Sequence, residues 1–265
     1  MVFSKRSFVT LAVLSIIFYV MYYFFTVRGI TYIWHWGDIP KMLFYYGTKS
    51  PGETTPGIHM GVLMIGFVLT LKISVVAIIF AILLGTILGI CRISSEPVTR
   101  AVAFTFVELV RNTPLLVQIY IIYFFVGSML RLSAFAAGTA ALAIFEGAYV
   151  AEIVRAGIQS INKGQMEAAR SLGMSYTKSM CHIVLPQAFK RIIPPLAGQF
   201  ISLIKDSSLV SVIALADLMF QGQQAVARTY SAFEIYFTVA ILYLVLTSTL
   251  SLATQYLERR LSISD

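Results

Sequence analysis

Three charged side chains lie inside long apolar segments, and their chemistry suits them to bind a polar group. Glu146 lies in the apolar run 134–154, while Lys205 and Asp206 interrupt the run 192–218. A charge held away from water needs an opposite charge or hydrogen bonds, so such residues usually face the interior of a helix bundle or a polar pathway. Adjacent residues point to different sides of a helix. Either the second run is therefore broken at Lys205, or each of its two charges has a partner on another helix.

The elements that position these charges are membrane-spanning helices. The chain has 265 residues, of which 58% are hydrophobic and 12% are charged, whereas a soluble domain carries about 25% charged residues. Several apolar segments reach the roughly 20 residues needed to cross a bilayer. They are continuous rather than alternating, which favours helices over a β-barrel. The sequence therefore predicts an all-α polytopic membrane protein.

About six transmembrane helices are expected. A basic pair precedes the first, and no small-residue cleavage site follows it, so this span is expected to stay in the protein. The next run, 62–90, is long for one span, and Lys72 is expected at its outer edge, where its side chain can reach water. An N-terminal region, 1–61, thus precedes a core at 62–260. The expected spans are 8–27, 73–90, 115–130, 134–154, 192–218 and 233–256.

The distribution of basic residues predicts the orientation. Most of the 20 lysines and arginines fall in segments on one side of the membrane, and the positive-inside rule makes that side cytoplasmic. The loop 157–191 and both termini are then cytoplasmic, as is an amphipathic helix expected at 97–110. The aromatic segment 28–61 is external, either as an interfacial hairpin or as a docking surface for an outside partner. Anchoring of the cytoplasmic loops, rather than binding to nucleic acid, explains the net charge of +8.

Two side-chain pairs carry structural expectations. Glu152 and Arg155 lie near a cytoplasmic helix end and can form an ion pair at i, i+3 spacing. Gly85 and Gly89 form a G-x-x-x-G pair that permits close contact between helices. The two cysteines fall on the cytoplasmic side, so no disulfide is expected there. With three scattered histidines they make no metal-binding pattern.

The polar stretch 164–186 separates two apolar runs and must stand in water. Glu167 lies in the first turns of a short predicted helix, where the helix dipole favours a carboxylate. Ala168 and Ala169 are small enough to let another backbone approach. Gly173 allows the helix to end in a sharp turn. The stretch therefore predicts a short, water-exposed helix that ends at a glycine.

One face of this short helix is distinctive. Met166, Ala169, Leu172 and Gly173 fall on it at helical spacing. The face predicts a small knob that can enter a groove on a partner protein. The alternative is an ordinary amphipathic helix at the membrane surface.

Spaced motifs extend over this region and beyond it. Glu167-Ala168-Ala169 begins the pattern E-A-A-x3-G-x9-I-x-L-P, which ends at Pro186. It resembles the EAA loop of the membrane-spanning permease subunits of ATP-driven bacterial importers. The R-N-T-P-L-L-V-Q, A-Y-V-A-E-I-V-R-A-G-I-Q and L-I-K-D-S-S-L stretches are similar to the branch of this family that carries polar amino acids; they begin at residues 111, 148 and 203. The resemblance covers roughly residues 70–260 and departs from the family at Glu146, where the family often has an uncharged residue.

This resemblance implies the type I importer fold of ABC transporters, here with an extra N-terminal span before a five-helix core. It implies a permease subunit without catalytic residues, in the inner membrane of a bacterium. Its implied partners are two cytoplasmic ATP-binding subunits, a second permease subunit (the same or related), an external substrate-binding protein and membrane lipid. ATP and Mg²⁺ would be bound by the partner subunits, and no cofactor by this chain.

The resemblance also assigns roles to residues. The knob would be the coupling helix, which moves with the ATPase. An amino acid that crosses the pore would present an ammonium and a carboxylate group, and each would need a matching charge. Glu146 could meet the ammonium and Lys205 the carboxylate, or Glu146 could only form an interhelical pair with Lys205 or Asp206. The expected ATPase-coupling residues are Gln165, Glu167, Ala168, Ala169, Leu172 and Gly173, and the pore candidates are Gln118, Glu146, Lys205, Asp206 and Ser207.

Two other functions stay open. One is an ABC permease for another small solute, such as an osmolyte or inorganic anion; the other is an ion-coupled secondary carrier of amino acids that acts alone. The sequence has no complete G-x-x-x-x-G-K-[ST] phosphate-binding motif, and Gly47-Thr48-Lys49-Ser50 is only a fragment of one. This favours a chain that takes energy from a separate ATPase. The sequence does not identify the amino acid, or whether the two permeases are identical.

Overall fold

The computed structural model describes residues 15–16, 18–20, 22–23, 32–48 and 57–261. The chain divides into two compact units, Met1–Gly37 and Asp38–Asp265. In the first, the described residues between 15 and 23 are helical, and Trp34 stacks on Trp36 with ring centroids 6.0 Å apart. Most of the expected first span, 8–27, lies outside the described residues.

A short helix and a two-stranded ribbon precede the long helices of the second unit. The 3-10 turn η1 (Trp36–Asp38) contains the boundary between the two units, and α2 (Ile39–Leu43) follows it. Strands β1 (Phe44–Gly47) and β2 (Gly57–Met60) then pair antiparallel, with Phe44 opposite Met60 and Gly47 opposite Gly57. Alternating residues of both strands are exposed, as a two-stranded ribbon requires. The aromatic segment expected outside the membrane therefore contains a true hairpin.

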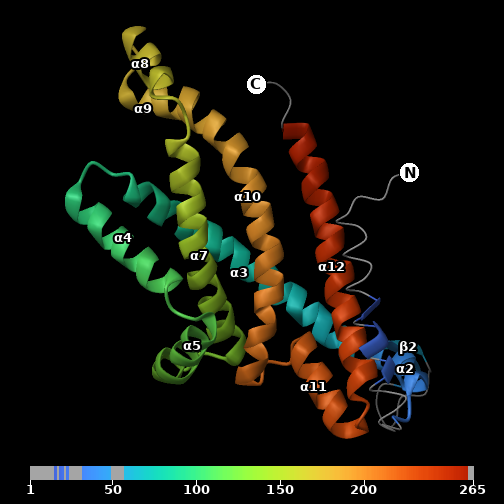
Figure 1. Ribbon diagram of the computed structural model, residues 1–265. Coiled ribbons are helices and arrows are strands. Elements are labelled where there is room, and N and C mark those ends of the chain that lie inside the picture. Colours follow the sequence, from blue (N-terminus) through green and yellow to red (C-terminus); the bar gives the residue numbers. More distant parts are fainter. Residues whose placement is uncertain (1–14, 17, 21, 24–31, 49–56, 262–265) are drawn as a thin grey trace, which may run out of the picture. The chain divides into compact units, whose positions relative to one another are not determined.

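Long apolar helices make up most of the second unit (Figure 1). Four helical segments in the described residues are long and apolar enough to cross a membrane, and a fifth span results if one bent pair is counted as a single span. This confirms the all-α polytopic class. The long helices are α3 (Val62–Arg92), α7 (Ala134–Gln159), α10 (Leu185–Asp206) and α12 (Ala232–Leu261). The bent pair joins α4 (Pro97–Arg111) to α5 (Leu115–Tyr120), the π-helical η2 (Ile121–Gly127) and α6 (Ser128–Leu130).

Two of these helices were expected in part from the sequence. Helix α3 contains the expected span 73–90, runs without a break through Lys72 and begins eleven residues before that span. The amphipathic helix expected at 97–110 is confirmed as α4, and its Val107 packs in a cluster with Ala148 and Ala151 of α7. It meets the segment Leu115–Leu130 at a bend of 104°.

The seam between α3 and α7 is the most extensive contact between helices in the described part of the chain. A Cβ atom added at Gly85 would lie 2.5 Å from Val150 Cβ and 2.6 Å from the Gly147 carbonyl oxygen. At Gly89 it would lie 2.8 Å from the Ala151 carbonyl oxygen. The absence of side chains at these two positions therefore lets the helix backbones touch, which confirms the close contact expected from the G-x-x-x-G pair.

Helix α10 carries two features that its sequence explains. Pro194 and Pro195 lie inside it, and each lacks the N–H that would continue the backbone hydrogen bonds. The helix ends at Asp206, and the chain continues as the 3-10 helix η4 (Ser207–Ile213), whose first hydroxyl donates to the Ile204 carbonyl oxygen over 2.7 Å. The α-helix in the apolar run 192–218 is therefore broken next to Lys205. This is the first of the two alternatives that the sequence left open, a broken helix rather than a separate partner for each charge. Helix α11 (Leu218–Thr229) follows, capped by Asp217.

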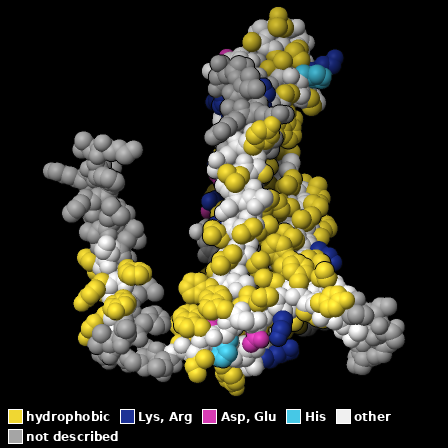
Figure 2. Space-filling view, turned by 90° about the vertical axis from the view of Figure 1, so that its right-hand side faces the viewer, with side chains coloured by type: hydrophobic (Ala, Val, Ile, Leu, Met, Phe, Trp, Pro, Cys, Tyr) yellow, Lys and Arg dark blue, Asp and Glu magenta, His cyan; other side chains and the backbone are white. Residues whose placement is uncertain are grey.

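Hydrophobic side chains cover the flank of the long helices in Figure 2, while basic side chains gather at the end that carries helices α8 (Lys163–Ser171) and α9 (Tyr176–Ser179). Many large apolar residues of the long helices are exposed; Phe80 is 55% exposed and Leu244 is 62% exposed. A soluble protein would bury such a surface, whereas lipid accommodates it. The long helices thus present an apolar surface suited to a bilayer.

Candidate functional site

The loop between α7 and α10 forms a compact helical protrusion at one end of the long helices (Figure 1). Asn162 caps α8 by accepting a hydrogen bond from the Gly164 N–H over 2.8 Å. Ser175 caps α9 in the same way through the Lys178 N–H. The π-helical η3 (Met180–Val184) then leads into α10. Polar caps at both short helices satisfy N–H groups that have no partner within the helix, so the loop holds a defined shape.

The end of α8 is fixed by a glycine. Gly173 has a φ of +82°, in the left-handed region that favours glycine. Its N–H donates to the Arg170 carbonyl oxygen over 3.0 Å, and the Met174 N–H donates to the Ala169 carbonyl oxygen over 3.1 Å. This is the Schellman arrangement. The chain therefore turns sharply after Leu172, as expected from the glycine.

The surface of the protrusion differs in part from the expected knob. Leu172 is 84% exposed, which is unusual for a leucine outside the membrane surface. Gln165, Glu167, Ala168 and Gly173 are exposed beside it. The predicted single face was wrong for two of its members, because Ala169 is only 4% exposed and Met166 packs against the cluster around Val184.

One hydrogen bond connects the protrusion to α10, and a second connects α10 to the end of α7. The Gln187 amide of α10 donates to Oε1 of Gln165 on α8 at 3.4 Å. The Arg191 guanidinium of α10 donates to the carbonyl oxygen of Ser160, at the end of α7, over 2.7 Å. The sequence motifs do not point to Gln187 or Arg191. A force on α8 therefore reaches α10 through a direct contact, and α10 is in turn bonded to the end of α7.

The buried acid expected on α7 is present, with a different partner. Glu146 is fully buried and accepts a hydrogen bond through Oε2 from the side-chain amide of Gln199 on α10. Its Oε1 has no hydrogen-bond partner among the described residues. Asp206 is a half-buried neighbour of Glu146. Lys205 is exposed and forms no ion pair in the described part of the chain, so the Glu146–Lys205 pair that was one of the alternatives is absent.

The remaining two pore candidates, Gln118 and Ser207, form hydrogen bonds to the backbone where helices bend or end. The Gln118 amide nitrogen donates to the Val110 carbonyl oxygen over 2.8 Å and to the Thr113 hydroxyl over 2.7 Å. It thus connects the two sides of the bend between α4 and α5. Ser207 is buried at the junction of α10 and η4, where its hydroxyl bonds the preceding turn. Both side chains are therefore engaged in holding the backbone in this conformation.

A network of charges joins α3, α4 and α7 near the protrusion. The expected Glu152–Arg155 pair is confirmed. Arg92 adds an ion pair of 2.8 Å to Glu152 and one of 3.5 Å to Glu108. At the start of α4, the Glu96 carboxylate accepts from the Thr99 N–H over 2.6 Å, and this backbone hydrogen bond lowers the pKa of Glu96. The network ties the ends of three helices together.

Comparisons with known proteins agree with this arrangement. The probable glutamine ABC transporter permease protein GlnM of Bacillus subtilis (strain 168) is 46% identical over 202 residues, which are 76% of this chain and 94% of that protein. The glutamine transport system permease protein GlnP of Escherichia coli (strain K12) is 39% identical over 201 residues, 75% of this chain and 92% of that protein. A crystal structure of an amino acid ABC transporter with histidines has 42% sequence identity and a TM-score of 0.71, and the match covers 75% of this chain and 94% of that one.

The fold is shared more widely than the sequence. An inward-facing structure of the MetNI methionine ABC transporter superposes with a TM-score of 0.67 at 20% identity, over 76% of this chain and 96% of that chain. The family model of the binding-protein-dependent transport system inner membrane component matches residues 77–263, which include the protrusion and the Glu146–Gln199 pair. Family model, sequence relatives and solved structures all point to the same protein class. The chain therefore belongs to the binding-protein-dependent transport system inner membrane components, the permease subunits of ABC transporters.

Proposed function

We propose that this chain is the permease subunit of an ATP-driven importer of a polar amino acid. The observation that carries the proposal is the protrusion formed by α8 and α9, with exposed Leu172 beside Glu167 and Ala168. A hydrogen bond joins α8 to α10, and another joins α10 to the end of α7. The relatives named for glutamine and arginine transport support an amino acid as the solute. Separate cytoplasmic ATPase subunits, a second permease subunit and an external binding protein complete the proposed complex.

The proposed mechanism converts movement of an ATPase into a tilt of helices. When ATP draws two ATPase subunits together, each one carries the α8 protrusion of its permease with it. The Arg191–Ser160 and Gln187–Gln165 hydrogen bonds transmit this movement to α7 and α10. Because Glu146 and Gln199 lie on these same two helices, their surroundings change with the tilt. ATP and the loaded binding protein both act by favouring the outward-facing state over the inward-facing one.

The interior polar groups fit a zwitterionic solute. An amino acid carries an ammonium group, which the orphaned Oε1 of buried Glu146 can accept, and a carboxylate, which the exposed Lys205 ammonium can meet. Each match reduces the cost of removing a charge from water. This assignment uses two groups that the bundle itself leaves without a charged partner among the described residues.

Replacement of Leu172 tests the proposed contact with the ATPase. Full burial of a leucine side chain contributes about 1.5–3 kcal/mol, so Leu172→Asp should weaken binding of the ATPase subunit at least tenfold. In the reconstituted complex, uptake and the ATPase activity stimulated by loaded binding protein should both be lost. Leu172→Met is the matched control, because it keeps an apolar side chain of similar size, and it should retain both activities.

Two results would contradict this account. Normal uptake by the Leu172→Asp complex would show that the exposed side chain does not contact the motor. Uptake that persists after ATP is depleted at a constant proton gradient, and that collapses with the gradient, would instead identify an ion-coupled carrier. Identification of the solute bound to the external protein then distinguishes an amino acid from another solute.

A further inference from the structure

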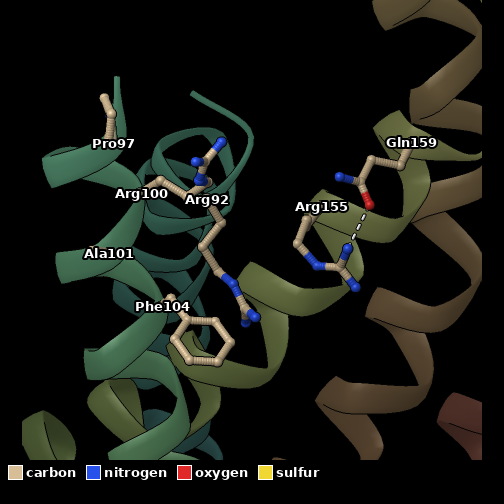
Figure 3. Close-up of a pocket in the computed structure, with 7 residues that line it drawn as sticks. All are labelled: Arg92, Pro97, Arg100, Ala101, Phe104, Arg155 and Gln159. Carbon is tan, nitrogen blue, oxygen red and sulfur yellow. Dashed lines mark hydrogen bonds between the residues drawn. The ribbon is translucent and has the colours of Figure 1, made fainter. Parts of the chain in front are cut away.

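A basic pocket lies between α4 and α7, near the protrusion but separate from it. It has a volume of about 430 Å³ and is formed by the end of α3, the first half of α4 and the last turns of α7. Three arginines reach it from three helices: Arg92, Arg100 and Arg155 (Figure 3). None of the residues assigned to the coupling surface or to the helix-bundle interior lines this pocket. It is therefore a second site, with its own chemistry.

The charges around the pocket leave one positive charge in excess. Arg92 bonds Glu152 and Glu108, and Arg155 bonds Glu152, with its remaining nitrogen on Gln159. Within residues 57–261, the Arg100 guanidinium forms no hydrogen bond and no ion pair, and its electrostatic neighbour is the exposed Glu96 carboxylate. Arg111 also pairs with Glu108, so four guanidinium groups share three carboxylates, Glu96, Glu108 and Glu152. The pocket can accept a group with a single negative charge, provided that this group approaches from the Arg100 side and away from Glu152.

The wall of the pocket is apolar below the arginines. The Arg92 guanidinium lies over the Phe104 ring at 5.2 Å, and this ring is 52% exposed (Figure 3). Phe104 therefore gives the pocket an exposed apolar wall beside its basic rim. Free phosphate would gain nothing from this ring, whereas an acyl chain of a lipid would bury it.

We propose that this pocket binds the headgroup of an anionic phospholipid. The phosphodiester, with one negative charge, is held by Arg100 and by N–H groups of Arg92 that do not bond a carboxylate, and an acyl chain covers Phe104. The ligand chemistry follows from the arrangement of a basic rim above an apolar wall at the end of membrane-spanning helices. The site joins the ends of α3, α4 and α7, so an occupied pocket would also stabilise the position of these helices.

Lipid binding to the full-length chain tests the site directly. The chain is purified in a neutral detergent and titrated with dioleoyl phosphatidylglycerol, dioleoyl phosphatidylcholine or inorganic phosphate, and native mass spectrometry measures the bound lipid. Phosphatidylglycerol should bind tighter than phosphatidylcholine. Inorganic phosphate should not displace it at equal concentration. Equal binding of the two lipids would overturn the proposal, and displacement by inorganic phosphate would show a site for free anions instead.

Substitution at Arg100 locates the site. One basic residue near a membrane surface contributes a factor of about five in binding, so Arg100→Gln should weaken phosphatidylglycerol binding about fivefold and leave phosphatidylcholine binding unchanged. Arg100 is exposed and makes no contact that the fold requires. Arg228→Gln, which removes an exposed arginine of α11, is the matched control and should bind like the natural chain. Equal weakening by both variants would show a general charge effect and refute the pocket.

Discussion

The close seam between α3 and α7 leads to a prediction whose size follows from two glycines. Gly85→Ala places a methyl group 2.5 Å from Val150 Cβ and 2.6 Å from the Gly147 carbonyl oxygen. Carbon atoms prefer separations of about 3.5–4.0 Å, so the contact is short by about 1 Å. Backbone atoms of α7 cannot rotate away, so the two helices must separate. Gly198→Ala in α10 is the control, because a Cβ there meets nothing within 4 Å.

Comparison of the two variants isolates the steric cost. Both replace a helical glycine and both gain about 1 kcal/mol of helix propensity. Only Gly85→Ala overpacks a seam, which costs about 1–3 kcal/mol. At about 2–4 °C per kcal/mol, the melting temperature of Gly85→Ala should fall at least 2 °C below that of Gly198→Ala. Thermal unfolding of the full-length chain, followed by the helical circular-dichroism signal in one detergent, measures both. Equal melting temperatures would refute the reasoning that backbone contact holds this seam.

Two further predictions concern single carboxylates. Glu146→Gln keeps the size of the side chain and removes its charge. Substrate preference in uptake assays should therefore change, while complex assembly and basal ATPase activity stay near normal. Equal loss of assembly and uptake would show that Glu146 only holds helices together. Glu96 has a pKa below the ordinary value of 4.5 because its carboxylate accepts the Thr99 N–H. The stabilisation that Glu96 gives to the start of α4 is therefore present above pH 4.5 and is lost as the pH falls through the lowered pKa. Hydrogen exchange at the Thr99 amide, corrected for the intrinsic rate, should become faster only as the pH falls through this lowered pKa. A protection factor that does not change with pH would contradict the capping role.

Several features of this protein follow from the sequence because they depend on residue type alone. Gly173 ends α8 in a left-handed turn because only glycine adopts it at low cost, and Gly85 and Gly89 let helices touch because they have no side chain. The spaced EAA motif and the long apolar runs gave the correct class of protein. In each of these cases the residue types in one stretch of sequence were sufficient to predict the feature.

Other features depend on which neighbour a side chain meets, and the sequence alone could not supply them. The helical pattern put Ala169 and Leu172 on one face, but the turn at Gly173 leaves Leu172 outside while Ala169 packs inside. Gln118 is a pore candidate from the sequence, but the motif that contains it does not show that its amide nitrogen bonds across the α4–α5 bend. Gln199 could have been noticed in the sequence, because it is a polar residue in an apolar run. Its hydrogen bond to Glu146 could not be predicted, because it depends on how α7 and α10 lie side by side.

The two prolines of α10 give the helices that leave the protrusion unequal stiffness. Pro194 and Pro195 remove consecutive backbone hydrogen bonds between the loop and Gln199, while α7 runs unbroken from its contact with Arg191 to Glu146. In the proposed mechanism, a movement of α8 therefore shifts α7 as one piece but bends α10 at its prolines. The Glu146–Gln199 hydrogen bond joins these two helices, so this difference in bending would change its length.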